Sequence, residues 1–304
     1  MKLVFMGTPA FAAACLAAVL ETEHQVVGVY TKPDTPKNRG MKLIPSEVKT
    51  LALAHGLPVF QPQTFRDDAV YEELRALAPD LIVAVAYGKI LPQRVLDIPA
   101  LGCINIHGSI LPALRGSAPI QWAVLNDLPE TGVTAMYMNA KMDEGDMIEA
   151  RTTPIGESET AGELMERLAP LGAALLKDTL TAIANGTVTR TPQNPALATY
   201  APMLTKELSP IDWTRPVRAV LAQIRGLNPW PVATASLGGT EFKIYEARSW
   251  PTEATAAPGT LLALTKKGLA VACGDGALLI TRLQAPGGKV MPAADYFRGH
   301  PIQL

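Results

Sequence analysis

The first residues of the chain, "MKLVFMGTPAFAAACLAAVLE" (1–21), contain the pattern on which the fold prediction rests. The apolar run 2–7 stops at Gly-Thr-Pro and gives way to an alanine- and leucine-rich stretch, 10–21. Such a run predicts a buried strand, and the stretch after the break predicts a helix. Because no small-residue cleavage site follows a long apolar region, we expect a first strand here rather than a secretory signal peptide.

The same alternation continues through the first two-thirds of the chain. Further strands are predicted at 24–31, 57–62, 80–88 and 103–109, and further helices at 45–56 and 67–78. Gly56 is expected to follow the end of the helix at 45–56. Residues 131–155 predict two strands around a turn, and 160–186 predict a long helix. Strands that alternate with helices favour an α/β fold with a parallel sheet covered on both faces.

The character of the sequence changes after residue 186. Residues 187–205 hold three prolines and no periodic pattern, which is typical of a linker. A helix is predicted at 215–227, and the turn-rich short strands after it favour a small β-barrel or sandwich. We therefore expect a first domain over 1–188, a linker over 189–205 and a second domain over 206–304.

The composition excludes several classes of protein. The 304 residues are 48% hydrophobic, which is enough for sizeable cores. Cys15, Cys103 and Cys273 form neither a CxxC nor a zinc-ligand spacing, so reduced thiols in a cytoplasmic protein are expected. No apolar stretch approaches the length of a membrane span. The turn after the first strand lacks both GxGxxG and GxxxxGK[ST], which argues against a nicotinamide dehydrogenase and a P-loop enzyme.

Charge is distributed unevenly along the chain. Residues 1–205 carry 16 Lys and Arg against 21 Asp and Glu, whereas residues 206–304 carry 11 against 7. A basic second part suits a polyanionic partner. A chance distribution of surface charge explains the same counts.

A polar pattern at the end of the strand predicted at 103–109 marks a candidate site. In "CINIHGS", Asn105 and His107 are two residues apart and therefore share one face of the strand. Asp143 in "MDEGDM" follows a later strand, and the carboxyl ends of strands in an α/β sheet form the ligand-binding edge. An amide, an imidazole and a carboxylate would then lie together, where the carboxylate orients the imidazole and favours its charged form. The alternatives are a packed core histidine, an asparagine that satisfies backbone groups, and an ordinary Asp-x-Gly hairpin turn.

Longer motifs around these residues carry a resemblance to a known family. Asn105 and His107 in "NIHGSILPALRGSAPIQ", with Asp143 in "MDEGD", resemble the formyltransferases that use 10-formyltetrahydrofolate. The stretches "VFMGTPAFA", "TKPDTPKNRGMKLIPSEVK", "LAPDLIVAVAYGKILP" and "RGLNPWP" are similar to the methionyl-tRNA branch of that family and cover most of the chain. The resemblance implies a Rossmann-like, mostly parallel sheet domain followed by a small OB-like β-barrel domain.

The resemblance also implies a reaction. The formyl group of 10-formyltetrahydrofolate passes to the α-amino group of methionine on initiator methionyl-tRNA, for translation initiation. Asn105 and a charged His107 would stabilise the developing oxyanion, and Asp143 would keep His107 charged and pass a proton toward the leaving nitrogen. No metal and no membrane are expected, and the enzyme is expected to act as a cytoplasmic monomer.

Two sets of binding residues follow from the resemblance. The folate pocket would involve Tyr87, Gly88, Ile90, Leu91, Ser109, Leu111, Pro112 and Met138, although packing at strand ends explains these residue types as well. The tRNA would contact the basic loop of residues 32–49 and the second domain. The residues expected at this contact are Lys37, Arg39, Lys42, Lys206, Arg215, Arg218, Arg225, Lys243, Lys266 and Lys267, with Arg39 at the acceptor end. A solvated basic loop without a partner is the alternative.

The chain departs from the family pattern at four positions. Ala113 and Leu114 stand where a basic and an aromatic residue are common, Asn139 where an acidic residue is common, and Lys141 where a glycine is common. These positions bear on the finer contacts to folate or to the aminoacyl end, and not on the reaction class.

Three other functions are compatible with parts of this pattern. They are a formyltransferase for a small amine such as glycinamide ribonucleotide or an amino sugar nucleotide, a hydrolase of formyl-folate, and a tRNA-binding module without activity. The basic loop and the basic second domain favour the tRNA enzyme over the first of these. The intact triplet Asn105, His107 and Asp143 argues against the inactive module.

Overall fold

The computed structural model describes residues 1–37, 42–252 and 256–304 and divides into two compact units. Unit 1 consists of Met1–Pro119, Thr131–Thr153 and Met165–Pro202. Unit 2 consists of Ile120–Glu130, Pro154–Leu164 and Met203–Leu304. Two short segments from the first two-thirds of the chain thus belong to unit 2.

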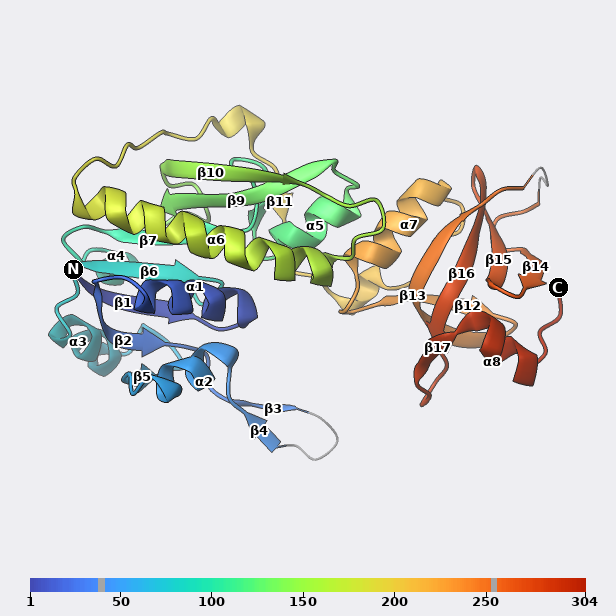
Figure 1. The fold of residues 1–304 in the computed structure, drawn as a ribbon, viewed down its shortest axis with the longest axis horizontal. Helices are drawn as coiled ribbons and strands as arrows, with labels where there is room; N and C mark the ends of the chain where they lie inside the picture. Colours follow the sequence, from blue (N-terminus) through green and yellow to red (C-terminus); the bar gives the residue numbers. More distant parts are fainter. Residues whose placement is uncertain (38–41, 253–255) are drawn as a thin grey trace. The chain divides into compact units, whose positions relative to one another are not determined.

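A seven-stranded sheet forms the centre of unit 1, in the order β10-β9-β7-β6-β1-β2-β5 (Figure 1). The strands are β1 (Lys2–Gly7), β2 (Gln25–Tyr30), β5 (Val59–Phe60), β6 (Leu81–Val85), β7 (Cys103–His107), β9 (Glu130–Tyr137) and β10 (Met147–Pro154). From β7 to β5 every neighbouring pair is parallel, whereas β9 runs antiparallel to β7. The predicted α/β fold with a mostly parallel sheet is confirmed.

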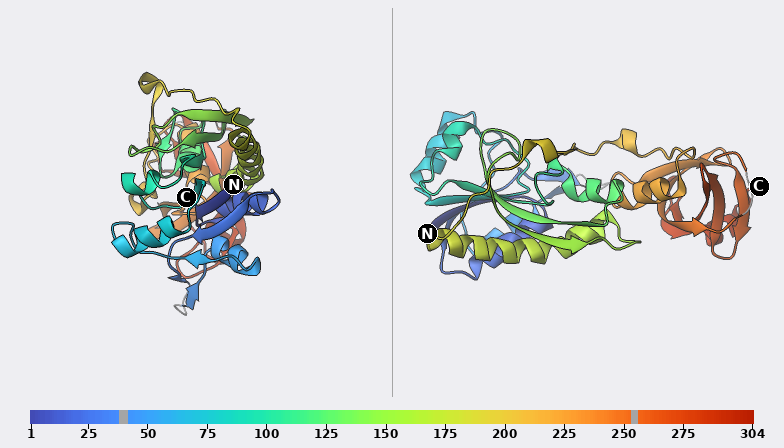
Figure 2. Two further views of the ribbon diagram at one scale, coloured as in Figure 1. Left: turned by 90° about the vertical axis from the view of Figure 1, so that its left-hand side faces the viewer. Right: turned by 90° about the horizontal axis from the view of Figure 1, so that it is seen from above.

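Helices cover both faces of this sheet (Figures 1 and 2). They are α1 (Ala10–Leu20), α2 (Glu47–Ala54), α3 (Asp68–Ala76), α4 (Gln93–Leu96) and α6 (Ala161–Ala184). Gly172 of α6 has no side chain, which lets the helix approach the sheet: a Cβ there would lie 3.3 Å from Cγ2 of Ile106. On the other face, Leu74 of α3 and Val95 of α4 share a core with Ile82 and Ala84. Even and odd positions of β6 and β7 therefore face different helices.

Helix α2 shows how local chemistry sets an element's ends. The Ser46 hydroxyl accepts a hydrogen bond from the Lys49 N–H and caps the first turn. Gly56, after the C-cap residue, has a φ of 65°, a left-handed conformation that glycine adopts without steric cost. The predicted role of Gly56 is confirmed. Just before α2, β3 (Thr35–Lys37) and β4 (Lys42–Ile44) pair as an antiparallel ribbon in the basic loop.

The predicted linker makes specific contacts with unit 1. Thr191 exchanges two backbone hydrogen bonds with Met147, each 2.9 Å long. Further along, β11 (Tyr200–Ala201) pairs in parallel with β8 (Arg115–Gly116). An extended segment can pair through its backbone groups without any periodic pattern of side chains. These pairings therefore could not be predicted from the periodicity of the sequence. After it re-enters unit 1 at Met165, the chain stays in that unit as far as Pro202.

Unit 2 is built on an antiparallel sheet in the order β12-β13-β16-β15-β14, with β17 paired to β16. Its elements are α7 (Val217–Gly226), β12 (Ala233–Leu237), β13 (Thr240–Trp250), β14 (Leu261–Thr265), β15 (Gly268–Cys273), β16 (Gly276–Gln284), β17 (Val290–Pro292) and α8 (Ala293–Gly299). The predicted short strands are confirmed. Among the pairings described, none joins β12 to β14, so closure into an OB-like barrel stays a prediction.

An ion-pair cluster anchors α7 to the segment after α5 (Pro119–Leu125) inside unit 2. Arg225 Nη2 lies 2.8 Å from Asp127 Oδ1, and Arg218 Nε bonds the other oxygen of the same carboxylate. Burial opposes the charge on Asp127, but the hydrogen bonds from the two guanidinium groups outweigh it and lower the pKa of that carboxyl. Arg225 is largely buried, whereas Arg218 is mostly exposed. Arg225, which the sequence predicts to contact tRNA, therefore also has a structural role, because it holds Asp127.

The variant Asp127→Asn is expected to lower the free energy of unfolding by about 1–2 kcal/mol at pH 7. Asparagine tolerates the φ of 51° at this position, so the change removes mainly the charge. Because folding lowers the pKa of Asp127, its stabilisation is complete above the unfolded-state pKa of about 3.9 and disappears as the pH falls through the folded-state value. Thermal unfolding of parent and variant at pH 7, 5 and 3.5 tests this. Equal transition temperatures at pH 7 would contradict the prediction, and Arg218→Ala serves as the weaker comparison.

Candidate active site

Strand β7 places Asn105 and His107 on the face of the sheet that α3 and α4 cover. Ala84 pairs with Asn105 and belongs to the core on that face, together with Cys103. Since alternate residues share a face, His107 projects to the same side, and Ile106 points toward α6. His107 is only 5% exposed, whereas Asn105 is half-buried. The predicted common face of Asn105 and His107 is confirmed.

The imidazole of His107 is held through one of its two nitrogens. Nε2 lies 2.9 Å from the carbonyl oxygen of Leu114, and a carbonyl can only accept. Nε2 is therefore the donor in this hydrogen bond, and Nδ1 is the ring nitrogen on the side of Asp143. A backbone carbonyl thus bonds one ring nitrogen, and the orientation of the ring by a carboxylate stays a prediction.

The carbonyl that holds His107 comes from a backbone with an unusual conformation. Leu114 has a φ of 59°, and its N–H donates to Oγ1 of Thr199 over 2.9 Å. The Ser109 hydroxyl donates to the Ala113 carbonyl over 2.7 Å and closes the loop from the other end. Left-handed backbone at a leucine persists only where surrounding contacts enforce it. The loop thus presents a rigid acceptor to the imidazole.

Asp143 reaches the site by a route that the sequence did not predict. Because β9 is antiparallel to β7, its last residue, Tyr137, pairs with Ile104 near the start of β7, and Met138 bonds Cys103. The loop after β9 therefore leaves the sheet at the end opposite to His107, and not at the same edge as expected. It folds back so that Asp143 Oδ2 lies 3.8 Å from Nδ1 of His107.

Backbone geometry keeps the returning loop in place. Asp143 has a φ of 52°, and its Oδ2 accepts a 2.8 Å hydrogen bond from the N–H of Gly116. Gly145 packs so closely on Tyr137 that a Cβ would overlap the carbonyl oxygen of that residue. Gly116 is also needed as glycine, because a Cβ there would lie 2.7 Å from the Ala201 oxygen. At both positions glycine allows two backbone segments to approach more closely than any side chain would permit.

The separation of 3.8 Å decides what the His107–Asp143 pair can do. It exceeds a normal hydrogen bond, so the Nδ1 position is not consumed by the carboxylate. A charged imidazole keeps a donor for a reacting oxygen or a water, and the nearby carboxylate balances its charge. Among the described residues, the amide of half-buried Asn105 has no recorded protein partner, so it is also free to donate. The arrangement suits proton transfer and oxyanion stabilisation.

The residues proposed for folate separate into two groups. The side chains of Tyr87, Leu91, Ser109 and Leu111 are buried. Tyr87 packs its ring on Phe65 at 6.1 Å, and burial raises the pKa of its hydroxyl. Ile90 is 83% exposed, and Gly88, Pro112 and Met138 are at least partly accessible. Contacts to a ligand are therefore open to residues 88–90 and to the side chains of Pro112 and Met138.

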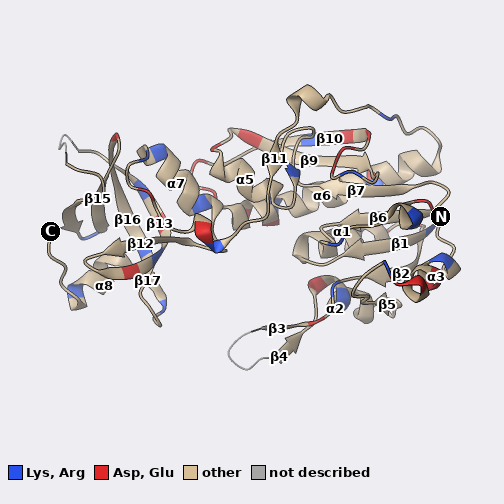
Figure 3. Cartoon of the chain, turned by 180° about the vertical axis from the view of Figure 1, so that it is seen from behind, with Lys and Arg blue, Asp and Glu red and all other residues tan. Residues whose placement is uncertain are grey.

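The residues proposed for tRNA are distributed over both units. Lys37 and Lys42 are opposite each other in the backbone register of the β3–β4 ribbon. Arg39 lies outside the described residues. In unit 2, the exposed residues are Lys206, Arg215, Arg218, Lys243, Lys266 and Lys267. Figure 3 shows basic residues on α7 and on the strands of this unit. The six cations of unit 2 are therefore accessible, and Arg218 is paired with Asp127.

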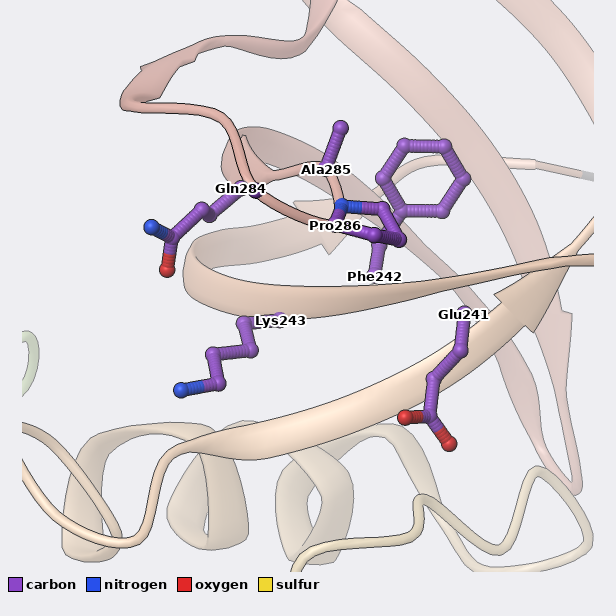
Figure 4. A pocket seen from close by; sticks show the side chains of 7 residues that line it. Glu241, Phe242, Lys243, Gln284, Ala285 and Pro286 are labelled. Carbon is purple, nitrogen blue, oxygen red and sulfur yellow. The ribbon is translucent and has the colours of Figure 1, made fainter.

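A shallow cavity of about 200 Å³ lies in unit 2, beside Lys243 (Figure 4). Lys243 and Glu241 extend from one side of β13, while Phe242 turns to the other side. The turn at 284–287 forms the opposite wall. The cavity contains none of the candidate catalytic residues, so it is separate from the chemistry at His107.

Several other groups bear on the site's chemistry. The three cysteines are unpaired and buried, and burial raises the pKa of Cys103, on the catalytic strand, to about 12, with Asp97 adding to the effect. Among the described residues, no three His, Cys, Asp or Glu side chains gather where they could hold a metal ion. Within the same residues, no helix has the length and apolar character needed to cross a bilayer.

Sequence reasoning missed the groups that hold the catalytic loop. Arg115, Gly116 and Gln193 all contact the loop around Asp143. The pair "RG" at 115–116 was visible within the family motif, but without a role. Gln193 gave no signal, because it lies in a non-periodic stretch fifty residues from Asp143.

Comparison with protein families covers nearly the whole chain. Residues 1–180 match the model described as formyl transferase, and residues 203–301 match its C-terminal domain. The methionyl-tRNA formyltransferase of Trichlorobacter lovleyi is 47% identical over 303 residues, which cover all of this chain and 95% of the relative. The protein of the same name from Pseudomonas paraeruginosa is 50% identical over 304 residues, covering all of this chain and 97% of the relative.

Solved structures with low identity share the fold. An N-formyltransferase from Helicobacter canadensis, in complex with folinic acid and dTDP-3-aminofucose, has a TM-score of 0.70 at 18% identity, over 92% of this chain and 98% of that one. HypX from Aquifex aeolicus, in complex with tetrahydrofolic acid, has a TM-score of 0.67 at 20% identity over 98% of this chain. This chain spans about half of HypX, 47% of its length. On the two family models and the full-length relatives, the chain belongs to the formyl transferase family.

Proposed function

We propose that this chain transfers the formyl group of 10-formyltetrahydrofolate to the α-amino group of methionine on initiator methionyl-tRNA. The full-length relatives at about half identity carry the name of this activity. The observation that carries the chemistry is the His107 ring, whose Nε2 is occupied by Leu114 while Nδ1 faces Asp143. We further propose that the protein acts in the cytoplasm as a monomer.

The amine nucleophile attacks the formyl carbon, and negative charge develops on the formyl oxygen. Asn105 and charged His107 act as donors to that oxygen, His107 through Nδ1. Asp143 stabilises the charged ring across the 3.8 Å gap. The attacking nitrogen must lose a proton and the leaving nitrogen must gain one, and Asp143 or a bridging water relays that proton.

The residues near the site fit a folate as the donor. 10-Formyltetrahydrofolate, when bound, supplies a formyl carbon attached to a nitrogen leaving group. Gly88 has a φ of 72°, and a Cβ there would lie 2.3 Å from Nζ of Lys32, so the glycine lets a cation approach the backbone that follows β6. Ile90 exposes an apolar side chain at the same place, and unpaired apolar surface suits the flat face of a pterin or an aryl ring. Backbone groups of the accessible residues 88–90 are suited to pair with polar atoms of the ligand.

The acceptor assignment rests on the basic groups of both units. An enzyme that acts on an amino group carried by a tRNA must also bind the tRNA phosphates. The cations of the β3–β4 loop and of unit 2 are suited to that binding. Sugar N-formyltransferases share this fold at under 20% identity, so fold alone does not choose between amines.

Transfer of radiolabelled formyl tests the proposal directly. The purified chain is incubated with labelled 10-formyltetrahydrofolate and, in parallel, methionyl initiator tRNA, glycinamide ribonucleotide or an amino sugar nucleotide. We expect label on the tRNA alone. Label on a small amine would keep the roles of His107 and Asp143 and overturn the acceptor assignment. Label released as formate in every reaction would identify a hydrolase.

The variant Arg39→Ala is expected to raise the KM for methionyl-tRNA roughly tenfold while leaving the KM for the folate unchanged. A single arginine contact to nucleic acid is worth about 1–3 kcal/mol, and tenfold corresponds to about 1.4 kcal/mol. Steady-state kinetics with each substrate varied in turn measures both constants. Arg75→Ala, at an exposed arginine of α3 paired with Glu72, is the matched control. Parent-like kinetics on tRNA would show that the loop assignment is wrong.

A further inference from the structure

The stretch 191–201, here called the clasp, contacts both loops that carry the catalytic geometry. Its first residue, Thr191, is bonded to Met147 at the start of β10. At its other end, the Thr199 carbonyl accepts from the Arg115 N–H over 2.8 Å, and the Ala201 carbonyl accepts from Ala118 over 3.2 Å. The clasp therefore joins the loop of Asp143 to the loop of Leu114 and Gly116.

Gln193 is the centre of this arrangement. Its Nε2 donates to the backbone carbonyls of Asp143 and Gly145, both over 2.8 Å. Its Oε1 accepts from Nε and Nη2 of Arg115, over 3.0 and 2.8 Å. Both donors and the acceptor of one side chain are thus used, and two of its bonds hold the backbone of the catalytic aspartate itself.

Arg115 completes the connection from the other side. It is 3% exposed, and its Nη1 lies 3.4 Å from the carboxylate of Glu144, the neighbour of Asp143. A buried guanidinium needs such partners, and Gln193 and Glu144 supply them. The next residue, Gly116, donates its N–H to the Asp143 carboxylate. Gly116 and Gln193 therefore bond Asp143 directly, and Arg115 holds Gln193 and the neighbouring Glu144.

We propose that Gln193 is a positioning residue for the formyl transfer, and that it acts by holding Asp143 at its distance from His107. The proposal rests on the proposed function of His107 and Asp143. Asp143 lies in a loop that turns back across the sheet with a left-handed φ, so its side chain has no regular element to hold it. A displacement of about 1 Å at a reacting group costs on the order of a hundredfold in rate.

Gln193→Met tests the proposal, because methionine has a similar length and lacks both the donors and the acceptor. We expect kcat to fall about 10- to 100-fold with each KM within twofold of the parent. Asn194→Ala is the matched control: Asn194 is the next residue, caps the short helix Pro195–Leu197, and has no recorded contact with the Asp143 loop. Parent-like kcat in Gln193→Met, or an equal loss in Asn194→Ala, would overturn the proposal.

A double-mutant cycle separates positioning from a general structural role. In the Asp143→Asn background, Gln193→Met is expected to cost less than threefold in kcat, because the group that Gln193 positions no longer bears its charge. A full additional loss there would show that Gln193 acts elsewhere. Gln193→Glu adds a second test, since it keeps an acceptor for Arg115 but removes the donors to Asp143 and Gly145, and we expect it to lose kcat as Gln193→Met does.

Hydrogen exchange gives a readout that does not depend on turnover. The Gly116 N–H is bonded to the Asp143 carboxylate, so we expect it to exchange at least tenfold faster in Gln193→Met than in the parent and the Asn194→Ala control. Unchanged exchange would overturn the proposal even if no amine accepted formyl. The parent's own activity on methionyl-tRNA tests the proposed function separately, so the two failures are distinguishable.

Discussion

Replacement of His107 by alanine is expected to reduce kcat for formyl transfer by about 10³-fold or more. The ring supplies a donor to the developing oxyanion and takes part in proton transfer, and each contribution is commonly worth 10²-fold or more. Nε2 is occupied by the Leu114 carbonyl, so no other described group takes the place of Nδ1 opposite Asp143. The loss therefore falls on kcat and not on the binding of tRNA.

Single-turnover formyl transfer and tRNA binding, measured on the same preparation, check this expectation. Removing a buried ring also leaves the Leu114 carbonyl without its donor, at a cost to stability of about 1–3 kcal/mol. Thermal unfolding of the variant therefore accompanies the kinetics, at a temperature where it is folded. His55→Ala, at an exposed histidine after α2, is the control. A kcat within tenfold of the parent would remove His107 from the mechanism.

The variant Asp143→Asn is expected to lower kcat about 10²- to 10³-fold with the loop intact. Asparagine retains an oxygen that accepts from the Gly116 N–H, and it tolerates the left-handed φ at this position. The change therefore removes the charge and little else. Where a carboxylate also selects the histidine tautomer, as in the Ser-His-Asp triad, the same substitution costs about 10⁴-fold. Here Leu114 selects the tautomer, which makes the expected loss smaller.

The comparison with Asp146→Asn makes the measurement specific. Asp146 lies in the same loop, and its backbone carbonyl bonds Tyr137, but its side chain does not face His107 in any recorded contact. We expect this control to keep parent-like kcat. A loss in Asp143→Asn as large as that of His107→Ala would mean that Asp143 itself carries the proton. No loss would leave His107 to act without a carboxylate.

Much of the fold was predictable because the signals are local. Apolar runs set the strands, and the i, i+2 spacing of Asn105 and His107 placed both on one face. Asp143 was expected to lie near His107, and it does, but the reason given for this was wrong. The prediction took its loop to leave the sheet beside His107, whereas the antiparallel β9 directs it to the other end. The direction of a strand is not encoded in its own residues.

Other features of the site were not predictable because they depend on contacts distant in the sequence. The acceptor for His107 is a backbone carbonyl, which any residue at 114 provides, so the leucine there gives no hint of its role. Tyr87 resembles a pocket residue at a strand end, yet its aromatic ring packs in the core. Gln193 lies in a stretch that composition alone describes as a linker.

The clasp also limits where natural or engineered recombination can join this enzyme to a different C-terminal partner. A crossover placed directly after α6 would exchange residues 191–201 and separate Arg115 from the glutamine that it bonds in this chain. A crossover after Pro202 would keep that pair within one parent. We expect functional chimeras of related enzymes to have their junctions after Pro202. The composition of the stretch after α6 is typical of a linker and would instead suggest that a junction is tolerated there.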